Sequence, residues 1–388
     1  MTYTGYERVL AALRHQEPDR IPFDLGGTVV TGININSLRN LRRYLGLTRE
    51  VRIRDRITQM ADTGDDLMDR LQVDVRNVCP SPPSRPGLAK DLGLVDSHYR
   101  LIDEFGMGWQ MPKEGGFYYD LYLSPLRDVS TPEEVKSYPW PDPLDEARYA
   151  QLKARADHAV QQEKRAYVLG RMSAGMWETA MWMAGYEKFY CDMLQNPSLV
   201  HAVMERFLDL KKQYWKKALD TVGENVMIVS CADDLGTQHS LLVSLDMYKD
   251  LIWPYHRDLF DFIKKEAKNE VYIFFHSCGA VKEAIPLLIE AGVDILNPIQ
   301  VNCRGMEDTR ALKRQYGNDL TFWGGSCDTQ HILPFGTPDQ VRDETKRRID
   351  DLAPGGGFIF APIHVIQGEV PPENIMAWWE TLQEYGSY

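Results

Sequence analysis

Short apolar runs alternate with amphipathic segments along most of the chain. The runs are rich in β-branched and aromatic residues, and the segments between them carry apolar residues with a period of about 3.6. This alternation is typical of a parallel sheet covered by helices. Eight runs predict a (β/α)8 TIM barrel. They are Ile21–Leu25, Val73–Val78, Ala166–Gly170, Val226–Ser230, Val271–Phe275, Asp294–Asn297, Thr321–Gly324 and Gly357–Ala361.

The segments between the runs each show one apolar stripe. Val281, Ile285 and Leu288 share a face in Ala280–Ala291, and Gly292 follows as a C-cap. The same pattern predicts helices over Leu199–Leu219, Met247–Lys268 and Pro338–Leu352.

One interval does not fit this period. From Cys79 to about Arg148 the chain contains the Pro-rich PSPPSRPG and a segment dense in Gly, Trp and Tyr. An interval of this length is too long for a plain loop. It predicts a β-hairpin insertion at about 79–148, after the second strand and over the barrel mouth. With no linker elsewhere, residues 1–388 are expected to form a single domain.

Composition and charge argue against several classes of protein. The net charge is −12 with no Lys/Arg run, which argues against a nucleic-acid partner. No stretch of about 18 apolar residues indicates a membrane span, so a soluble cytoplasmic protein is expected. The six cysteines are dispersed along the chain, which argues against a disulfide scaffold.

Candidate site residues follow the predicted strands, because catalytic groups of such barrels lie at the carboxyl ends of the strands. The fifth strand ends in His276-Ser-Cys278-Gly279. Thiolate with imidazole is a ligand pairing that zinc prefers, and a catalytic zinc needs about three protein ligands. Cys327 and His364 follow the seventh and eighth strands and are candidates to complete the site. The alternative is a packed thiol beside a hydrogen-bonded histidine.

Three acidic residues are candidate catalytic groups. Asp233 and Asp234 are adjacent, so only one is expected to face the mouth, and a helix-capping role is an equal alternative. Asp24 in DLGG would orient a substrate or a base, unless the glycines only mark a tight turn.

Other residues are candidates to contact the substrate. Arg171 would bind a carboxylate or phosphate, or else pair with Glu178. Trp177 lies in a Met-rich stretch that would form core or a wall for a planar aromatic substrate. Gln300 and Gln367 complete this candidate set.

Several segments together resemble the uroporphyrinogen decarboxylase superfamily, nearly from end to end. They are ERVLAALRHQEPDRIPFDLGG, ADDLGTQ, FFHSCGAVKEAIPLLIEAGVDILNPIQ, LTFWGGSCDTQHILPFGTPDQVRDE and PGGGFIFAPIHVIQGEVPPENI. The superfamily contains tetrapyrrole decarboxylases and zinc-dependent, corrinoid-linked methyltransferases. The decarboxylases carry an Arg-rich segment after the first strand, where this chain reads DLGGTVVTGININ without an arginine.

The resemblance is stronger to the methyltransferase branch, which carries H-x-C-G after the fifth strand. Relatives that methylate thiols have an acidic residue where this chain has Gln300, and a cysteine where it has His364. His364 is therefore the first candidate for a further zinc ligand, and Cys327 is the second.

The resemblance implies a methyltransferase component of a demethylase system. Such an enzyme holds Zn2+ and moves a methyl group from a small methylated substrate to the cob(I)alamin of a separate corrinoid protein docked at the mouth. The chain shows no cobalamin-binding signature of its own. A homodimer is a candidate assembly. The alternatives are a tetrapyrrole decarboxylase and a non-catalytic barrel that serves as a binding subunit.

Overall fold

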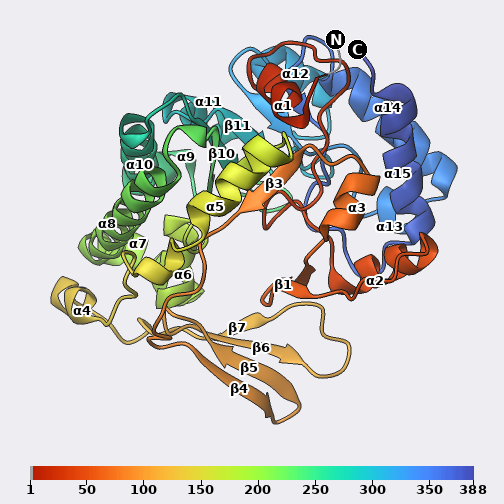
Figure 1. The fold of residues 1–388 in the computed structure, drawn as a ribbon. Helices are drawn as coiled ribbons and strands as arrows, with labels where there is room; N and C mark the ends of the chain where they lie inside the picture. Colours follow the sequence, from red (N-terminus) through yellow and green to blue (C-terminus); the bar gives the residue numbers. More distant parts are fainter. Residues whose placement is uncertain (1–2) are drawn as a thin grey trace.

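The computed structural model describes residues 3–388 as an α/β barrel (Figure 1). Seven parallel strands form one sheet in the order β13-β12-β11-β10-β9-β8-β3. The strands are β3 (Val75–Val78), β8 (Ala166–Leu169), β9 (Ile228–Ala232), β10 (Tyr272–His276), β11 (Ile295–Asn297), β12 (Thr321–Trp323) and β13 (Phe358–Ile359). The predicted barrel is confirmed, and each of these strands lies within two residues of a predicted run.

The first predicted strand is the exception. Residues 21–25 form no regular strand, but they lie between the two edges of the sheet. The N–H of Phe360 donates to the carbonyl of Pro22 at 2.8 Å, and the N–H of Asp74 donates to the carbonyl of Phe23 at 2.8 Å. Pro22 has no N–H to donate, so a full ladder cannot form here. This segment still links β13 to the start of β3 and closes the barrel.

Side chains from every strand fill the barrel interior. At least one buried residue from each strand belongs to a single cluster, together with Val9, Ala12 and Leu13 of the first helix, α1 (Gly5–Leu13). The interior is therefore a packed core that α1 covers at one end. The strand residues are Val75, Val168, Ile228, Phe274, Ile295, Trp323 and Ile359.

The helices surround the sheet. The predicted helix Pro338–Leu352 is reproduced as α14, whose capping box at Thr337 fixes its start. The predicted helix Met247–Lys268 is two helices, because the chain breaks at Ile252 before Pro254. The others are α2 (Ile35–Tyr44), α3 (Asp65–Arg70), α4 (Pro132–Ser137), α5 (Leu152–Asp157), α6 (Met176–Ala184), α7 (Tyr186–Gln195), α8 (Pro197–Val222), α9 (Leu245–Leu251), α10 (Trp253–Glu266), α11 (Ile285–Glu290), α12 (Thr309–Tyr316), α13 (Ile332–Phe335) and α15 (Pro372–Tyr385). None of the helices in the described residues is long and apolar enough to span a bilayer.

The interval between β3 and β8 contains an antiparallel sheet of four strands, where the sequence predicted one hairpin. The strands are β4 (Lys90–Val95), β5 (His98–Ile102), β6 (Gly108–Pro112) and β7 (Asp120–Leu123). This sheet lies at the opposite end of the barrel from α1 (Figure 1). Trp109 of β6 packs edge-on against Trp182 of α6, with ring centroids 5.3 Å apart. A small ribbon of β1 (Ile53–Asp55) and β2 (Met60–Ala61) lies nearby in the chain.

A buried carboxylate joins the parts of the chain that meet at the α1 end. Asp74 accepts hydrogen bonds from Arg8 at 2.7 Å, Arg20 at 2.8 Å and the N–H of Phe23 at 2.9 Å. Its side chain is fully buried. Asp74 therefore ties α1 and the closing segment to the start of β3.

Asp24 lies in the closing segment, and its side chain is fully buried. Its carboxylate accepts from the N–H of Gly27 at 2.7 Å and from the indole Nε1 of Trp323 at 2.9 Å. Burial raises the pKa of Asp24 to about 6, against the opposing effect of these hydrogen bonds. The sequence predicted a catalytic role for Asp24, and the structure places it as a support of the turn and of β12.

We expect Asp74→Ala to destabilise the fold by about 3–5 kcal/mol, because it leaves buried arginine donors without their partner. Urea denaturation would measure this loss. The control Asp91→Ala removes an exposed pair with Arg56 and should cost no more than about 1 kcal/mol. Equal losses in the two variants would contradict the role given to Asp74.

We expect Asp24→Asn to gain stability relative to the wild type as pH rises. The folded pKa of about 6 lies above the ordinary 3.8, so the wild-type native state retains a proton that the unfolded state releases. Wild-type stability is therefore lost as pH rises from about 4 to 6, by roughly 3 kcal/mol relative to the asparagine variant. Urea denaturation at several pH values would measure the difference in stability between the two proteins. A difference that does not change with pH would contradict the raised pKa of Asp24.

Candidate metal centre

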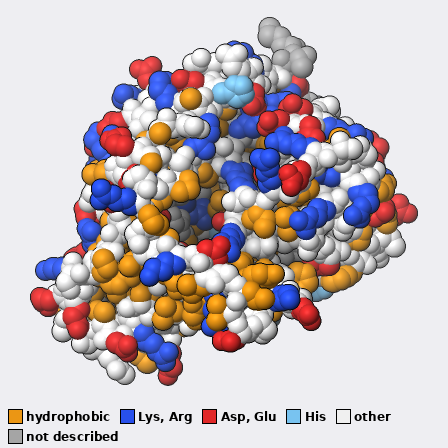
Figure 2. Space-filling view, turned by 60° about the horizontal axis from the view of Figure 1, so that its bottom comes forward, with side chains coloured by type: hydrophobic (Ala, Val, Ile, Leu, Met, Phe, Trp, Pro, Cys, Tyr) orange, Lys and Arg blue, Asp and Glu red, His pale blue; other side chains and the backbone are white. Residues whose placement is uncertain are grey.

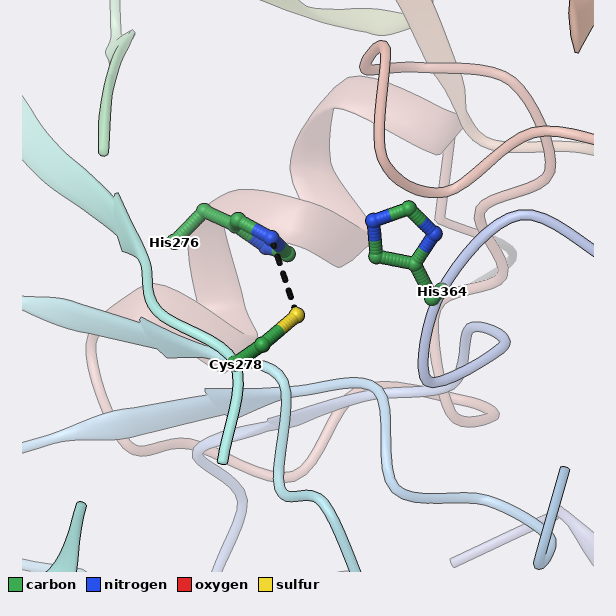
Figure 3. A group of neighbouring side chains, drawn as sticks. All are labelled: His276, Cys278 and His364. Atoms are coloured by element: carbon green, nitrogen blue, oxygen red, sulfur yellow. Dashed lines mark hydrogen bonds between the residues drawn. The ribbon is translucent and has the colours of Figure 1, made fainter. Parts of the chain in front are cut away.

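Three potential metal ligands converge at the end of the barrel opposite α1. His276 is the last residue of β10, Cys278 lies in the loop that follows, and His364 lies in the loop after β13 (Figure 3). The Sγ of Cys278 lies 3.4 Å from Nε2 of His276, and one ligand atom from each of the three residues lies within 4.8 Å of the others. Two tetrahedral zinc ligands of these types are separated by about 3.5 Å, given Zn–S and Zn–N bonds of about 2.3 and 2.0 Å.

A second residue orients His276. Nδ1 of His276 lies 2.6 Å from the side-chain oxygen of Asn297. The Asn297 amide nitrogen donates to the carbonyl of Trp323 at 2.8 Å. The amide oxygen is therefore the acceptor, so Nδ1 carries the proton and Nε2 presents its lone pair toward Cys278. This is the arrangement that metal-binding histidines use.

Burial sets the protonation of the three residues. It lowers the pKa of His276 to about 3, with a further contribution from Arg171, and lowers the pKa of His364 to about 4, with repulsion from His276. Both imidazoles are thus neutral and able to bind a metal at neutral pH. Burial and the charges of Asp234 and Glu178 raise the pKa of Cys278 well above its ordinary value. A cation at this position would reverse that effect and hold the thiolate.

The donor set therefore fits a metal such as zinc. A thiol and two neutral imidazoles converge, and His276 is held in the required tautomer. The three side chains leave a fourth tetrahedral position for a ligand from the cavity, as in catalytic zinc sites.

Backbone contacts hold the loop that carries Cys278. The N–H of Cys278 donates to Asp234 at 2.8 Å, and the N–H of Gly279 donates to the side chain of Gln300 at 2.7 Å. Gly279 has φ of +98°, and a Cβ there would lie 2.4 Å from the backbone of Gly236. The glycine of H-x-C-G is thus required by close approach. Gln300 was predicted to contact substrate, and in the structure its side-chain oxygen accepts this hydrogen bond from the loop.

The two adjacent aspartates have different roles. Asp233 accepts from the N–H groups of Met176, Trp177 and Glu178 and lies 2.6 Å from Nε2 of His256. It caps the start of α6, which is the helix-capping alternative that the sequence left open for these two residues, and its predicted catalytic role stays a prediction. Asp234 instead lines the central cavity, with one carboxylate oxygen 3.8 Å from Nε2 of His276.

A cavity of about 390 Å³ adjoins the three ligands. This size falls at the small end of the roughly 300–1,000 Å³ typical of ligand sites. Figure 2 shows a hollow near the centre of this face, with hydrophobic side chains along its edge. Phe105, Met107 and Trp109 of the inserted segment and Trp182 of α6 line the cavity beside His276. The insertion thus contributes part of the cavity wall.

Glu178 is a site residue that the sequence identified only as a candidate partner of Arg171. It lines the cavity from the first turn of α6. Burial, followed by the charges of Asp234 and Asp233, raises the pKa of Glu178 well above its ordinary value. Burial also raises the pKa of Asp234. Burial therefore shifts both carboxyl groups toward the protonated form, which is the form that can act as an acid.

The other predicted residues are divided between cavity and core. Arg171 lines the cavity. Trp177 is fully buried in α6, and Trp182, one turn further on, supplies the aromatic wall instead. The side-chain amide of Gln367 donates to the carbonyl of Val365 at 2.7 Å. Cys327 is buried and contacts the carbonyl of Asp328 at 3.9 Å, outside the group of three ligands. It is therefore the less favoured of the two predicted further ligands.

Comparison with known proteins gives relatives of two activities. The chain is 24% identical over 284 residues to the uroporphyrinogen decarboxylase of Shewanella amazonensis, covering 69% of this chain and 73% of the relative. It is also 24% identical over 258 residues to the methylated-thiol–coenzyme M methyltransferase of Methanosarcina mazei, covering 66% of this chain and 63% of the relative. These relatives are enzymes.

A solved structure shares the whole fold. A methyltransferase from Methanosarcina mazei aligns over 99% of both chains with a TM-score of 0.67 at 15% identity. A model of the uroporphyrinogen decarboxylase (URO-D) family matches residues 101–385, well over half of the 388-residue chain. This protein therefore belongs to the uroporphyrinogen decarboxylase family.

Proposed function

We propose that this protein is a zinc-dependent methyltransferase that transfers a methyl group from a small methylated substrate to the cob(I)alamin of a separate corrinoid protein. The observation that carries the proposal is the convergence of His276, Cys278 and His364 beside the cavity. A thiolate and two imidazoles are ligands for a Lewis-acidic metal, and an open fourth position suits a substrate heteroatom.

The cavity supports methyl transfer over tetrapyrrole decarboxylation. Its volume of about 390 Å³ suits a substrate with one ring better than a tetrapyrrole. The segment after Asp24 also lacks the arginines that the resemblance associates with decarboxylases.

The side chains supply positioning and protons. A bound zinc ion would act as a Lewis acid on the heteroatom that carries the methyl group. Asn297 holds Nε2 of His276 toward the metal position, and the cavity walls hold the substrate. The carbon–heteroatom bond breaks as cobalt(I) gives its electron pair to the methyl carbon. The heteroatom retains the pair of the broken bond and takes a proton from Glu178 or Asp234.

The cobalt must approach from outside. A corrinoid is much larger than the cavity, so it remains in its own protein, which docks over the mouth. The inserted segment contributes the buried Phe105 and Trp109 to the cavity wall, so the exposed part of this segment is the surface that such a partner would meet.

We expect purified wild-type protein to contain about one zinc ion per chain. His276→Ala, Cys278→Ala and His364→Ala should each lose the metal, because each removes a ligand. The matched control Cys327→Ala removes another buried cysteine and should retain it. Elemental analysis would measure the content, and a wild type without stoichiometric metal would contradict the proposal.

We expect Asn297→Ala to weaken zinc binding by about 10–100-fold while the three ligands remain, because His276 loses its fixed orientation. Competition with a zinc chelator would measure the affinity. An unchanged affinity would show that the hydrogen bond to Asn297 has no part in metal binding.

Activity provides the direct test. Incubation of the metal-loaded protein with methoxylated and methylated compounds and cob(I)alamin should convert the corrinoid spectrum from the reduced to the methylated form. Cys278→Ala should abolish this conversion, and Cys327→Ala should not. Formation of product from uroporphyrinogen, without any methyl transfer, would favour the decarboxylase instead.

A further inference from the structure

Arg171 has hydrogen-bonding capacity that the fold does not use. It follows β8 by two residues and lines the cavity. Its Nη1 donates to the hydroxyl of Ser230 at 2.9 Å, and its buried Nε has no partner. Within the described residues, no carboxylate oxygen lies within 4.0 Å of the guanidinium, although Glu178 and Asp234 line the same cavity. Arg171 is only partly buried, but its Nε is buried, and a buried donor without a partner is costly unless a ligand meets it.

The backbone beside Arg171 is held in place. The ammonium group of Lys211, on α8, donates to the carbonyl of Met172 at 3.0 Å, the hydroxyl of Ser173 at 3.2 Å and the carbonyl of Ala174 at 2.6 Å. Lys211 is buried, and Ser173 has φ of +63°. The loop after β8 is therefore fixed by three hydrogen bonds to one cation. Arg171 is presented from a rigid support, as a specific anion contact requires.

Arg171 lies in the same enclosure as the metal centre. His276 and His364 line the cavity with it. One small ligand can therefore meet the guanidinium and the metal position at the same time.

One part of the wall is suited to an aromatic ring, beside a part that carries the carboxyl groups of Asp55, Asp103 and Glu104. Phe105, Trp109 and Trp182 line the cavity, and Met107 lies with them. Trp109 and Trp182 meet edge-on with centroids 5.3 Å apart, so they form a rigid corner. Aromatic and thioether groups are favourable neighbours for a planar ring.

We propose that the substrate is an aromatic carboxylate with a methylated heteroatom on the ring, and that Arg171 binds its carboxylate. This inference rests on the proposed function for the fate of the methyl group. The guanidinium fork matches a carboxylate in a bidentate contact. Ser230 keeps the fork oriented, and the aromatic wall holds the ring so that the methylated substituent reaches His276 and Cys278.

Binding of a matched pair of probes tests the proposal without corrinoid. The probes are 3-methoxybenzoate and its neutral analogue 3-methoxybenzamide, titrated into the metal-loaded protein by calorimetry. We expect the wild type to bind the benzoate at least 10-fold more tightly. Arg171→Met should weaken benzoate binding by roughly 10–100-fold, the loss expected for a buried charge-assisted contact, and change benzamide binding by less than about 3-fold.

The controls separate this contact from loss of the fold. Arg206→Met removes an arginine that lies over Trp140, away from the cavity, and should leave both affinities unchanged. Retained benzamide binding in Arg171→Met would show an intact cavity, and Arg171→Lys should restore only part of the benzoate affinity, since lysine lacks the fork.

Three results would overturn the proposal: equal affinity of the wild type for the two probes, no binding of either, or unchanged benzoate binding in Arg171→Met. Failure of the proposed function is a separate result. Benzoate binding that depends on Arg171, without methyl transfer to cob(I)alamin, would retain the anion contact and reject the methyltransferase. Methyl transfer from a neutral donor that is unaffected by Arg171→Met would retain the methyltransferase and reject the anion contact.

Discussion

Closure of the parallel sheet is the constraint on which the site depends. The backbone of Pro22 and Phe23 hydrogen-bonds the two ends of the seven-stranded sheet, and Asp74 ties this segment to α1. Closure brings the loop after β13 opposite the loop after β10. Without it, His364 would lie at one edge of an open sheet, far from His276 in strand order. The three-ligand group is thus a product of barrel geometry, and local sequence supplies only two of its members.

Much of the fold could be predicted because it depends on local patterns. The apolar runs located seven strands, and the apolar period of 3.6 residues located α14. The closing segment was predicted as a strand because its apolar residues match the pattern, which does not register the missing N–H of Pro22. The four-stranded insertion depends on how the strands within residues 90–123 pair with one another. A Gly- and Trp-rich composition does not specify how many strands will pair.

The site was predictable only in part. His276 and Cys278 are adjacent after one strand, so their proximity follows from sequence. Glu178 was not predicted as a site acid, because its position depends on how α6 enters the cavity, and the only available signal was its place in the first turn after the third strand. The sequence also could not decide between Asp233 and Asp234, since that choice depends on three N–H groups of α6. Electrostatically, burial favours the uncharged forms of the site residues, since it lowers the pKa of His276 and raises the pKa of Glu178.

Trp323 connects the interior of the barrel to its rim. Its indole donates to Asp24, and its carbonyl accepts from the Asn297 amide that orients His276. A chain of four residues on different segments therefore runs from the turn after Pro22 to the metal position. For protein engineering, positions 24, 297 and 323 form one design unit. A change at position 297 acts on the His276 imidazole directly, whereas a change at position 24 reaches it only through Trp323, so variants at these positions are best designed in combination.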